Sequence, residues 1–542
     1  MKGVLVRNIG LPVAAAILAV GLWQWPGLPA LVLVALGGGL LLLGLHDLLQ
    51  ARRSVLRNYP IIGHARYLME SIRPEMRQYF IEDDDVQVPF SRQQRAIVYQ
   101  RAKNELETRA FGTQRDIYGD RYEWINHSIQ PSHIESADFR VEVGSDCAQP
   151  YRASVFNISA MSYGSLSANA ILALNGGAKR GGFYHDTGEG SISRFHRVHG
   201  GDLVWEIGTG YFGCRDADGR FDPEAFAGNA CDPQVKMIEL KLSQGAKPGQ
   251  GGLLPGAKVT AEIAEARGVA VGRDVVSPAR HSAFDTPLGL LAFIDRLRQL
   301  SGGKPTGFKL AIGHPWEWFA IAKAMEHSGI VPDFIVVDGA EGGTGAAPME
   351  FADHVGVPMR EGLMLVHNTL VGLDLRSRVR VAAAGKLTTA FDLARTMAIG
   401  ADWCNAARGF MFALGCIQSR SCHTDACPTG VATQDPGRQR SLVVTDKIER
   451  VHSYHRNTLA ALRKLLEAAG LQHPDELAPE HIIRRISQVK VHALSQIYPR
   501  VWRGELKAGA QRQTRHEVFD LFWDPVRPDT FAAPTRVGSV RR

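Results

Sequence analysis

The first fifty residues form two long apolar stretches separated by a short break. Residues 11–22 and 28–45 are almost entirely apolar, and no charged side chain occurs between Arg7 and Asp47. A Trp-Pro-Gly sequence at 25–27 separates them, and tryptophan favours the membrane interface. Stretches of about 16–20 apolar residues are long enough to cross a bilayer as helices. The pattern predicts a transmembrane helical hairpin that serves as an N-terminal anchor.

Basic residues flank this predicted hairpin on both sides. Lys2 and Arg7 precede it, and Arg52, Arg53 and Arg57 follow it. Because positive residues stay on the cytoplasmic side, we expect a multi-pass anchor in the cytoplasmic membrane with both ends in the cytoplasm. A secretory signal peptide is the alternative, but the apolar region is too long and has no evident cleavage motif.

From Val155 onward the chain alternates short apolar runs with glycine-rich loops and helical stretches. Strand, loop and helix repeat about eight times, which is typical of a (β/α)8 TIM barrel, an α/β fold. A doubly wound parallel sheet repeats in a similar way and is the alternative. The strand-and-loop segments are 155–165, 183–191, 203–213, 235–249, 275–281, 307–313, 334–345, 379–386 and 403–409.

These changes of pattern predict four regions. They are a membrane anchor at 1–57, a cap or linker at 58–147, the barrel at 148–440, and a helical C-terminal extension with a tail at 441–542. The extension begins with an amphipathic helix that should end at Gly470. The acidic run 82–85 is interpreted as a solvated loop, because it lacks the spaced ligands of a calcium site. Residues 532–542 are expected to be a disordered tail.

Composition indicates a large folded protein in a reducing compartment. The 542 residues are 45% hydrophobic and 22% charged, enough for a sizeable core and two or more domains. Seven cysteines without regular pairing argue against a disulfide scaffold. The net charge is +7, but no stripe of basic and aromatic residues occurs, so no nucleic-acid binding is expected. An anionic membrane face or an acidic partner suits this charge better.

The most specific motif is a cysteine-rich loop at 415–436. It places Cys416, Cys422 and Cys427 at C-x5-C-x4-C spacing, with a proline directly after the last cysteine. Three thiolates suit a cuboidal iron–sulfur cluster that lacks one iron, and a Cys-Pro ending stiffens such loops.

Two other interpretations of this loop stay open on spacing alone. A structural zinc site would need a fourth ligand, which His423 or Cys404 could supply. The three cysteines could also be unliganded, since free cysteines behave as small apolar residues.

Glycine-rich loops after the later predicted strands suit a phosphate-bearing cofactor. Residues 340–346 are small and include Gly343, so their backbone amides can approach a ligand closely. Gly385 follows the next predicted strand, and Ala407 and Arg408 follow the one after it. The loops after the last two strands of a barrel usually bind phosphate, and Arg408 adds a cation.

Four further residues suggest a flavin and an anionic substrate. Lys309 ends an apolar strand, where its ammonium could stabilise a reduced flavin, the alternative being a surface lysine. Gln244 and Lys247 lie in a long glycine-rich loop that could hold a carboxylate, although a plain flexible loop is the alternative. Arg267 follows on a helix and could clamp a second carboxylate.

Together these motifs resemble the synthase domain of glutamate synthase, over roughly residues 148–438. The resemblance rests on SAMSYGSLS at 159–167, the QGAKPGQGG and LPG segments at 244–256, EGGTGAAP at 341–348, AGK at 384–386, and the cysteine-rich loop with its CPTGVAT ending. By this resemblance the chain binds FMN and a 3Fe-4S cluster, with Cys416, Cys422 and Cys427 as the cluster ligands.

The resemblance also implies a reaction. In the family, ammonia condenses with 2-oxoglutarate, and reduced FMN delivers hydride to the imine carbon, which gives L-glutamate. Gln244, Lys247 and Arg267 match positions that hold the oxo-acid, and Glu189 matches an acidic residue near the ammonia route. Lys247, Glu189 and Lys309 are the expected catalytic residues. The expected FMN contacts are Met161, Ser162, Gly210, Lys309, Gly343, Gly385, Ala407 and Arg408.

The sequence departs from the family pattern in ways that bear on the substrate and the electron donor. Leu253 stands where the family usually has a glutamine that helps to bind the oxo-acid. No cysteine precedes Cys147, so glutamine hydrolysis by an N-terminal cysteine is not expected, and the family's β-helical domain is missing. No dinucleotide-binding unit is predicted, so the electrons are expected from a ferredoxin-like or NADPH-dependent partner protein.

Two other functions fit the same scaffold. One is the reaction of the related N-methylglutamate synthases, in which methylamine replaces ammonia. The other is a membrane-bound electron-transfer component that binds both cofactors without turning over an amino acid.

Overall fold

The computed structural model describes residues 9–84, 88–345, 347–507, 509 and 516–534, and the chain divides into two compact units. The first unit is Met1–Ser91 and the second is Arg92–Arg542. Lys2, Arg7, the end of the acidic run and most of the predicted tail lie outside the described residues. The predicted boundaries at 57, 147 and 440 stay predictions.

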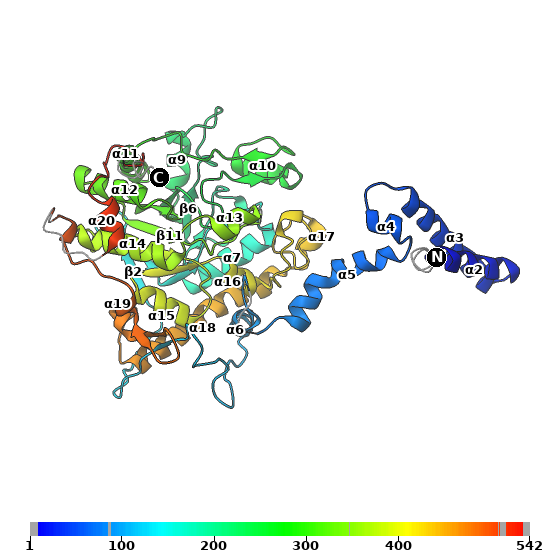
Figure 1. Cartoon of the computed structure of the whole chain (residues 1–542). Coiled ribbons are helices and arrows are strands. Elements are labelled where there is room, and N and C mark those ends of the chain that lie inside the picture. Colours follow the sequence, from blue (N-terminus) through cyan, green and yellow to red (C-terminus); the bar gives the residue numbers. More distant parts are fainter. Residues whose placement is uncertain (1–8, 85–87, 346, 508, 510–515, 535–542) are drawn as a thin grey trace, which may run out of the picture. The chain divides into compact units, whose positions relative to one another are not determined.

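The apolar stretches of the first unit form two packed helices. α2 spans Gly10–Trp23 and α3 spans Leu28–Leu49, and Figure 1 shows them side by side. Glycine permits this close approach, because a Cβ on Gly37 would lie 2.5 Å from the Leu18 nitrogen. α3 has 22 residues and is long and apolar enough to cross a membrane, whereas α2 has 14. Insertion of this hairpin into a membrane stays a prediction.

Three shorter helices complete the described part of the first unit. They are α4 (Ser54–Asn58), α5 (Gly63–Met76) and the π-helical turn η1 (Arg77–Ile81). The fully buried Asp47, near the end of α3, accepts a hydrogen bond from the Ile61 backbone nitrogen at 3.0 Å. His64 Nε2 lies 3.0 Å from both oxygens of the same carboxylate. These contacts join the start of α5 to the end of α3.

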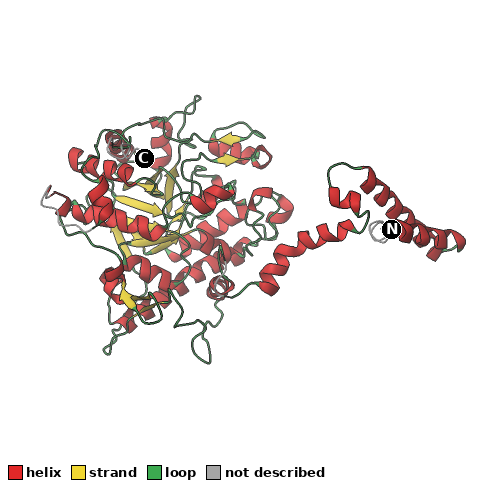
Figure 2. Cartoon of the chain, viewed as in Figure 1, coloured by secondary structure: helices red, strands yellow, loops and turns green. Residues whose placement is uncertain are grey.

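Eight parallel strands close into a barrel at the centre of the second unit (Figures 1 and 2). In chain order they are β4 (Phe156–Ile158), β5 (His185–Asp186), β6 (Leu203–Ile207), β7 (Val235–Lys241), β10 (Thr306–Leu310), β11 (Phe334–Asp338), β12 (Arg380–Ala384) and β13 (Trp403–Ala406). The barrel closes where β13 pairs with β4, with Ala406 opposite Ile158. Closure leaves no open sheet edge, so the TIM barrel is confirmed and the doubly wound sheet is wrong.

One of the nine predicted strand segments lies outside the barrel. Residues 275–281 contribute only β9 (Val275–Val276), which pairs antiparallel with β8 (Leu253–Leu254). This hairpin and α10 (Ala261–Arg267) belong to the long connection between β7 and β10. The other eight segments supply the barrel strands. The segment at 275–281 has the same apolar pattern, and such a pattern does not distinguish a strand of a short hairpin from a barrel strand.

Helices follow the barrel strands and surround them in Figure 2. They are α7 (Ala168–Gly181), α8 (Arg194–Arg197), α9 (Pro223–Ala230), α11 (Pro287–Leu300), α12 (Pro315–Ser328), α14 (Met359–Gly372), α15 (Ala390–Ala398) and α16 (Arg408–Leu414). After the barrel, α18 (Val444–Ala469) packs against α7 and α6 (Arg92–Lys103). Gly470 ends α18 with a φ of 77°, a left-handed conformation that glycine adopts without strain, as predicted.

The remaining elements extend the barrel unit. β1 (Glu123–Ile125), β14 (Ile482–Arg485) and β15 (Val491–Ala493) form an antiparallel sheet, and β2 (Arg140–Val143) pairs with β3 (Tyr151–Ser154). The other short helices are α13 (Met349–His354), α17 (Pro436–Gln439), α19 (Leu494–Ile497) and α20 (Glu517–Phe522).

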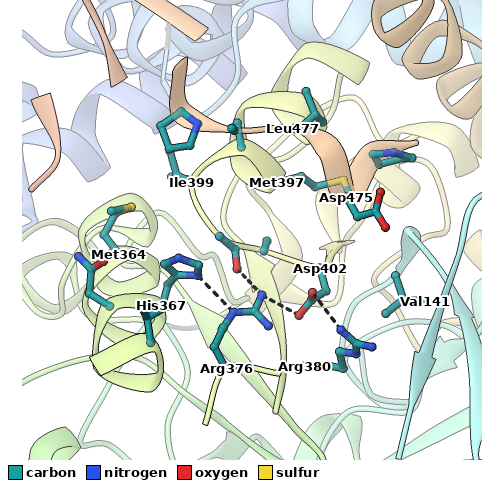
Figure 3. Close-up of a pocket in the computed structure, with 18 of the residues that line it drawn as sticks. Val141, Met364, His367, Arg376, Arg380, Met397, Ile399, Asp402, Asp475 and Leu477 are labelled. Atoms are coloured by element: carbon teal, nitrogen blue, oxygen red, sulfur yellow. Dashed lines mark hydrogen bonds and ion pairs between the residues drawn. The ribbon is translucent and has the colours of Figure 1, made fainter. Parts of the chain in front are cut away.

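A cavity of about 540 Å³ lies at the amino-terminal end of β12 and β13 (Figure 3). Arg380 begins β12, and Asp402 directly precedes β13. Arg376 lines this cavity and donates hydrogen bonds to the Gly400 carbonyl oxygen at 2.9 Å and to His367 Nδ1 at 3.2 Å. Parallel barrels bind their substrates at the carboxyl ends of the strands, so the active site is expected at the other end.

Candidate active site

The loops at the carboxyl ends of β4 and β5 lie against each other. Met161 and Ser162 follow β4, and Gly188 and Glu189 follow β5. A Cβ on Gly188 would lie 2.6 Å from the Ser162 nitrogen and 3.1 Å from the Met161 nitrogen. Only glycine permits this approach. It brings Met161 and Ser162, the predicted FMN contacts, next to Glu189.

Glu189 is paired with a lysine that ends the next-but-one strand. Lys241, the last residue of β7, places Nζ 3.2 Å from Glu189 Oε2 and donates to Gln244 Oε1 at 2.6 Å. Burial raises the pKa of Glu189, but the Lys241 ammonium outweighs it, and the pKa lies below its ordinary value. Glu189 is therefore an ionised carboxylate near neutral pH.

Lys247 and Arg267 are buried cations whose charges act on Glu189. Their exposed fractions are 6% and 5%, and burial lowers the pKa of both groups while Glu189 opposes the change. Arg267 Nη2 donates to the Tyr163 carbonyl oxygen at 3.2 Å, and a Cβ on Gly190 would lie 2.8 Å from that nitrogen. Within the described residues its Nε has no hydrogen-bond partner. An unused donor on a buried guanidinium is suited to a carboxylate ligand.

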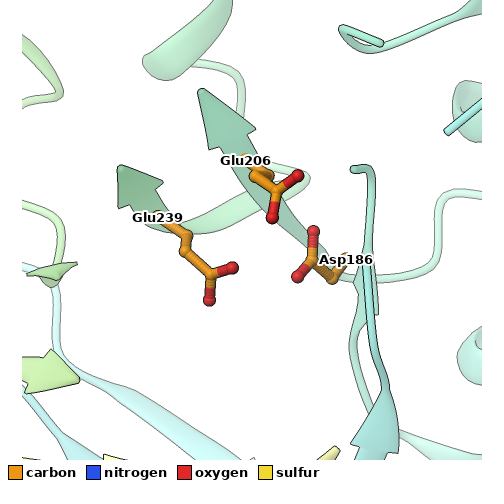
Figure 4. A group of neighbouring side chains, drawn as sticks. All are labelled: Asp186, Glu206 and Glu239. Carbon is orange, nitrogen blue, oxygen red and sulfur yellow. The ribbon is translucent and has the colours of Figure 1, made fainter. Parts of the chain in front are cut away.

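Lys309 is buried among three carboxylates, Asp186, Glu206 and Glu239, which Figure 4 shows turned toward one another. Its side chain is buried, and its Nζ hydrogen-bonds to Glu206 of β6 and lies 3.3 Å from Glu239 Oε1 of β7. Asp186 of β5 completes the group, since one carboxylate oxygen from each of the three acidic residues lies within 4.8 Å of the others. The surface-lysine alternative is therefore wrong.

The three carboxylates share fewer than three negative charges. Burial, with the Asp186 carboxylate next, raises the pKa of Glu239 well above its ordinary value, and burial also raises the pKa of Asp186. Glu239 is thus protonated and hydrogen-bonded to Asp186. Glu206 pairs with Lys309. Lys241 adds a second cation, 3.9 Å from Glu206 Oε1. Two ammonium groups at this cluster oppose the binding of a metal cation.

A second group of cations lies at the carboxyl ends of β12 and β13. Gly385 and Lys386 follow β12, and Arg408 opens α16 just after β13. Burial lowers the pKa of Arg408 to about 10, and burial and Arg408 together lower the pKa of Lys386. A Cβ on Gly343 would lie 2.9 Å from Arg408 Nη1, and Arg408 also donates to the Glu341 carbonyl oxygen. Two desolvated cations on neighbouring strands suit a phosphate group.

The β8–β9 hairpin forms a rim beside Glu189. Leu253 of β8 is 50% exposed, and a Cβ on the preceding Gly252 would lie 2.8 Å from Glu189 Oε1. A Cβ on Gly210, in the loop after β6, would lie 3.2 Å from Ser277 Oγ, just after β9. Leu253, where a glutamine was expected, thus directly follows the glycine that approaches the ionised carboxylate.

The three cysteines of the predicted cluster loop follow α16. Tyr99 donates to the Cys416 carbonyl oxygen at 2.6 Å, and Lys258 donates to the Cys422 carbonyl oxygen at 2.9 Å. Burial, together with the neighbouring thiolates, raises the pKa of Cys416 to about 12. Burial also opposes ionisation of Cys427, but backbone N–H groups just after it donate to its sulfur and lower its pKa.

The described thiols do not form the compact ligand group that a zinc ion needs. Four-coordinate zinc, with Zn–S bonds of about 2.3 Å, would hold its thiolates about 3.8 Å apart. Among the described side chains, the group whose ligand atoms all lie within 4.8 Å is the carboxylate trio, and the cysteines and His423 do not form another. Cys404 is buried in β13. An iron–sulfur cluster places iron and sulfide between its cysteines and so accommodates wider spacing.

Comparison with known families accounts for this barrel. A family model described as the conserved region in glutamate synthase matches residues 124–472, which is more than half of the chain. The chain belongs to the glutamate synthase family. The match includes every barrel strand, the cysteine-rich loop and α18. The resemblance inferred from the motifs is confirmed.

Similar proteins carry related names. The chain is 38% identical over 477 residues to the glutamate synthase large subunit-like protein YerD of Bacillus subtilis, which is 80% of this chain and 90% of that protein. It is 31% identical to an archaeal glutamate synthase (NADPH) of Methanocaldococcus jannaschii, over 66% of each chain. A solved flavocytochrome b2 variant with pyruvate bound is 12% identical, with a TM-score of 0.42, over 81% of this chain and 89% of that chain. This structural likeness is too low to add to the assignment.

Sequence reasoning missed the charged interior of this glutamate synthase-family barrel. Lys241, Asp186, Glu206 and Glu239 were not singled out. Lys241 pairs with Glu189, Glu206 and Glu239 contact Lys309, and Asp186 lies in the same carboxylate group. A signal was present, because Glu206 and Glu239 interrupt otherwise apolar strands, and a carboxylate on a buried strand needs a partner. The identity of that partner required the barrel's geometry.

Proposed function

We propose that this protein is a membrane-anchored FMN and 3Fe-4S oxidoreductase that aminates 2-oxoglutarate, or a similar oxo-acid, with ammonia to give L-glutamate. The observation that carries the proposal is the meeting of two buried cations, Lys247 and Arg267, with the ionised Glu189 at the barrel's carboxyl end. Membership of the glutamate synthase family supports an oxidoreductase of this type.

The chain's own residues provide a suitable site for FMN. Arg408 and Lys386 would hold the phosphate, beside the glycines and the alanine of the surrounding loops. The loops after β4 and β6, together with Lys309, would hold the ring. The remaining proposed contacts are Met161, Ser162, Gly210, Gly343, Gly385 and Ala407. When bound, the flavin supplies the hydride that reduces the imine.

The cations near Glu189 orient the oxo-acid. Lys247 and Arg267 bind its two carboxylates, and Gln244 donates a further hydrogen bond from its amide. Ammonia replaces the keto oxygen, which leaves as water, and the imine then takes up a hydride and a proton to become the amine. The ionised Glu189 accepts an N–H hydrogen bond from ammonia and passes a proton from the nitrogen to the departing oxygen, so that condensation releases water and no net proton.

The cysteine-rich loop is proposed to hold the 3Fe-4S cluster. Three thiols without a zinc-sized arrangement fit three irons, and the N–H groups around Cys427 stabilise its thiolate. The cluster would pass electrons from a ferredoxin-like or NADPH-dependent partner protein to the active site. The α2–α3 hairpin is proposed to hold the enzyme at the cytoplasmic face of the membrane, on the basis of the apolar character of α3.

Anaerobic absorption spectroscopy of the full-length protein in detergent tests the reaction. The reduced protein is mixed with 2-oxoglutarate and ammonia, separately and together, and glutamate is quantified. We expect the flavin absorbance to return only with both substrates, and Lys247→Ala to slow that return more than ~10-fold at low oxo-acid concentration. Lys236→Ala, which removes a partly exposed lysine of β7, the strand before the Lys247 loop, is the matched control.

Two other outcomes of this experiment would contradict the proposal. Flavin and cluster bands that do not respond to the substrates would refute amination, and reduction by a quinol without oxo-acid would favour the electron-transfer component instead. A protein that lacks both bands would refute the cofactor assignment.

Methylamine in place of ammonia is a second candidate, and Leu253 favours it. Leu253 is half-exposed and directly follows Gly252, the residue that approaches Glu189, and an apolar residue at this rim suits a methyl group better than the expected glutamine amide would. The rates with methylamine and ammonia are compared in the wild type and in Leu253→Gln. A methylamine preference that disappears in Leu253→Gln supports this candidate, and an ammonia preference in the wild type contradicts it.

A further inference from the structure

α5 and η1 expose a continuous run of apolar side chains. Phe80 is 78% exposed and Leu68 is 58% exposed, values that soluble helices rarely combine on one side. We define the exposed face of α5 as the side chains of Leu68, Met69, Ile72, Met76, Tyr79, Phe80 and Ile81.

α5 is an amphipathic helix. Leu68, Ile72 and Met76 recur every four residues and therefore line one side of α5. Because each residue turns the helix by about 100°, Arg73 projects only about 40° from Met69, at the edge of the apolar side. Arg66 occupies the same edge, where it forms a 3.0 Å ion pair with Glu70. Arginines thus border the exposed face of α5.

The chain before α5 connects it directly to the apolar hairpin. The buried Asp47, near the end of α3, bonds to Ile61 and His64, which fixes the start of α5 beside the end of the longest apolar helix. Residues 50–81, up to the end of η1, contain six arginines and two glutamates and no other acidic residue or lysine, and the acidic run begins at Glu82, whose carboxylate lies 3.9 Å from Arg77. This excess of positive charge complements an anionic lipid surface.

We propose that α5 and η1 lie in the interface of the membrane that the hairpin enters. The exposed face of α5 contacts the acyl chains, and Arg66, Arg73 and Arg77 contact anionic lipid headgroups. This inference rests on the proposed membrane anchor, and it adds a lipid-binding surface to it. A helix held in this way joins the barrel unit to the bilayer surface and favours membranes rich in anionic lipid.

Site-specific photocrosslinking of the full-length protein in lipid vesicles tests the orientation. Benzoylphenylalanine replaces Met69, Phe80, Ser71 or Leu36, one at a time, in vesicles of phosphatidylcholine with phosphatidylglycerol. Ser71, two residues from Met69 on the opposite side of α5, is the matched control, and the exposed Leu36 of α3 reports on the anchor. We expect at least ~5-fold more lipid adduct at Met69 and Phe80 than at Ser71, and strong adduct formation at Leu36.

The outcomes separate this inference from the anchor itself. Adducts at Leu36 but no excess at Met69 and Phe80 would overturn the inference and leave the anchor intact. No adduct at Leu36 would overturn the anchor, and the inference with it. Crosslinks from Met69 to another polypeptide would identify a protein partner instead of lipid.

The charge requirement is tested separately in the same vesicles. Removing phosphatidylglycerol should lower the Phe80 adduct yield about 3-fold or more, and the double variant Arg73→Gln/Arg77→Gln should reduce this lipid dependence. Equal yields in phosphatidylcholine alone would overturn the anionic-lipid part of the inference.

Discussion

Replacing Glu206 with glutamine should destabilise the barrel more than any comparable change at its surface. Glu206 is 1% exposed and forms a buried ion pair with Lys309. In Glu206→Gln, Lys309 keeps Glu239 at 3.3 Å, but the raised pKa of Glu239 leaves that carboxyl protonated, and Asp186 acts on Lys309 only through its nearby charge. A buried ammonium therefore loses its hydrogen-bonded counter-charge.

The expected size of this effect follows from the burial of the pair. Removing one partner of a buried ion pair costs roughly 3–5 kcal/mol, because the remaining charge stays desolvated. Unfolding entropy of about 2.1 cal/mol/K per residue, over ~450 residues in the barrel unit, makes 1 kcal/mol equal to about 1 °C in melting temperature. We expect the melting temperature of Glu206→Gln to fall by about 3–5 °C.

The assay is thermal unfolding of the detergent-solubilised protein, followed by tryptophan fluorescence. Glu449→Gln is the matched control, since it removes the same charge from an accessible pair with Arg180 and should change the melting temperature by less than ~1 °C. The double variant Glu206→Gln/Lys309→Met should recover much of the loss, because no buried charge remains. Equal melting temperatures for Glu206→Gln and wild type would refute the assignment of the ionised pair.

Two further predictions concern binding and the cluster. Burial lowers the pKa of Lys247, so it loses its charge at a lower pH than an ordinary lysine, and the KM for the oxo-acid should rise with pH before ordinary lysines lose their charge. Lys247→Arg should keep a flatter profile, and a flat wild-type profile would count against Lys247 as the carboxylate-binding cation. Cys422→Ser should lower iron content and the cluster absorbance more than ~10-fold, whereas Cys231→Ser, at an exposed thiol, should not. Full iron retention in Cys422→Ser would exclude that cysteine as a ligand.

Local patterns in the sequence were sufficient for the framework of this protein. Short apolar runs alternating with glycine loops predicted the barrel, and Gly470 marked the end of α18. The cysteine spacing and the glycine motifs identified the family, because such motifs are contiguous in sequence. Apolar length predicted α2 and α3 for the same reason. These features depend on neighbours within a few residues of one another.

Other features were decided only when the chain folded. The segment at 275–281 has the apolar pattern of a barrel strand, but it pairs with Leu253–Leu254 in a hairpin outside the barrel. Lys309 meets Glu206 and Glu239 only because β6, β7 and β10 are neighbours in the closed sheet. The sequence by itself determined which segments are strands and helices, since periodicity and spacing are local properties. The tertiary structure alone decided which charges face one another inside the barrel, because that depends on strand register and closure between residues far apart in the chain.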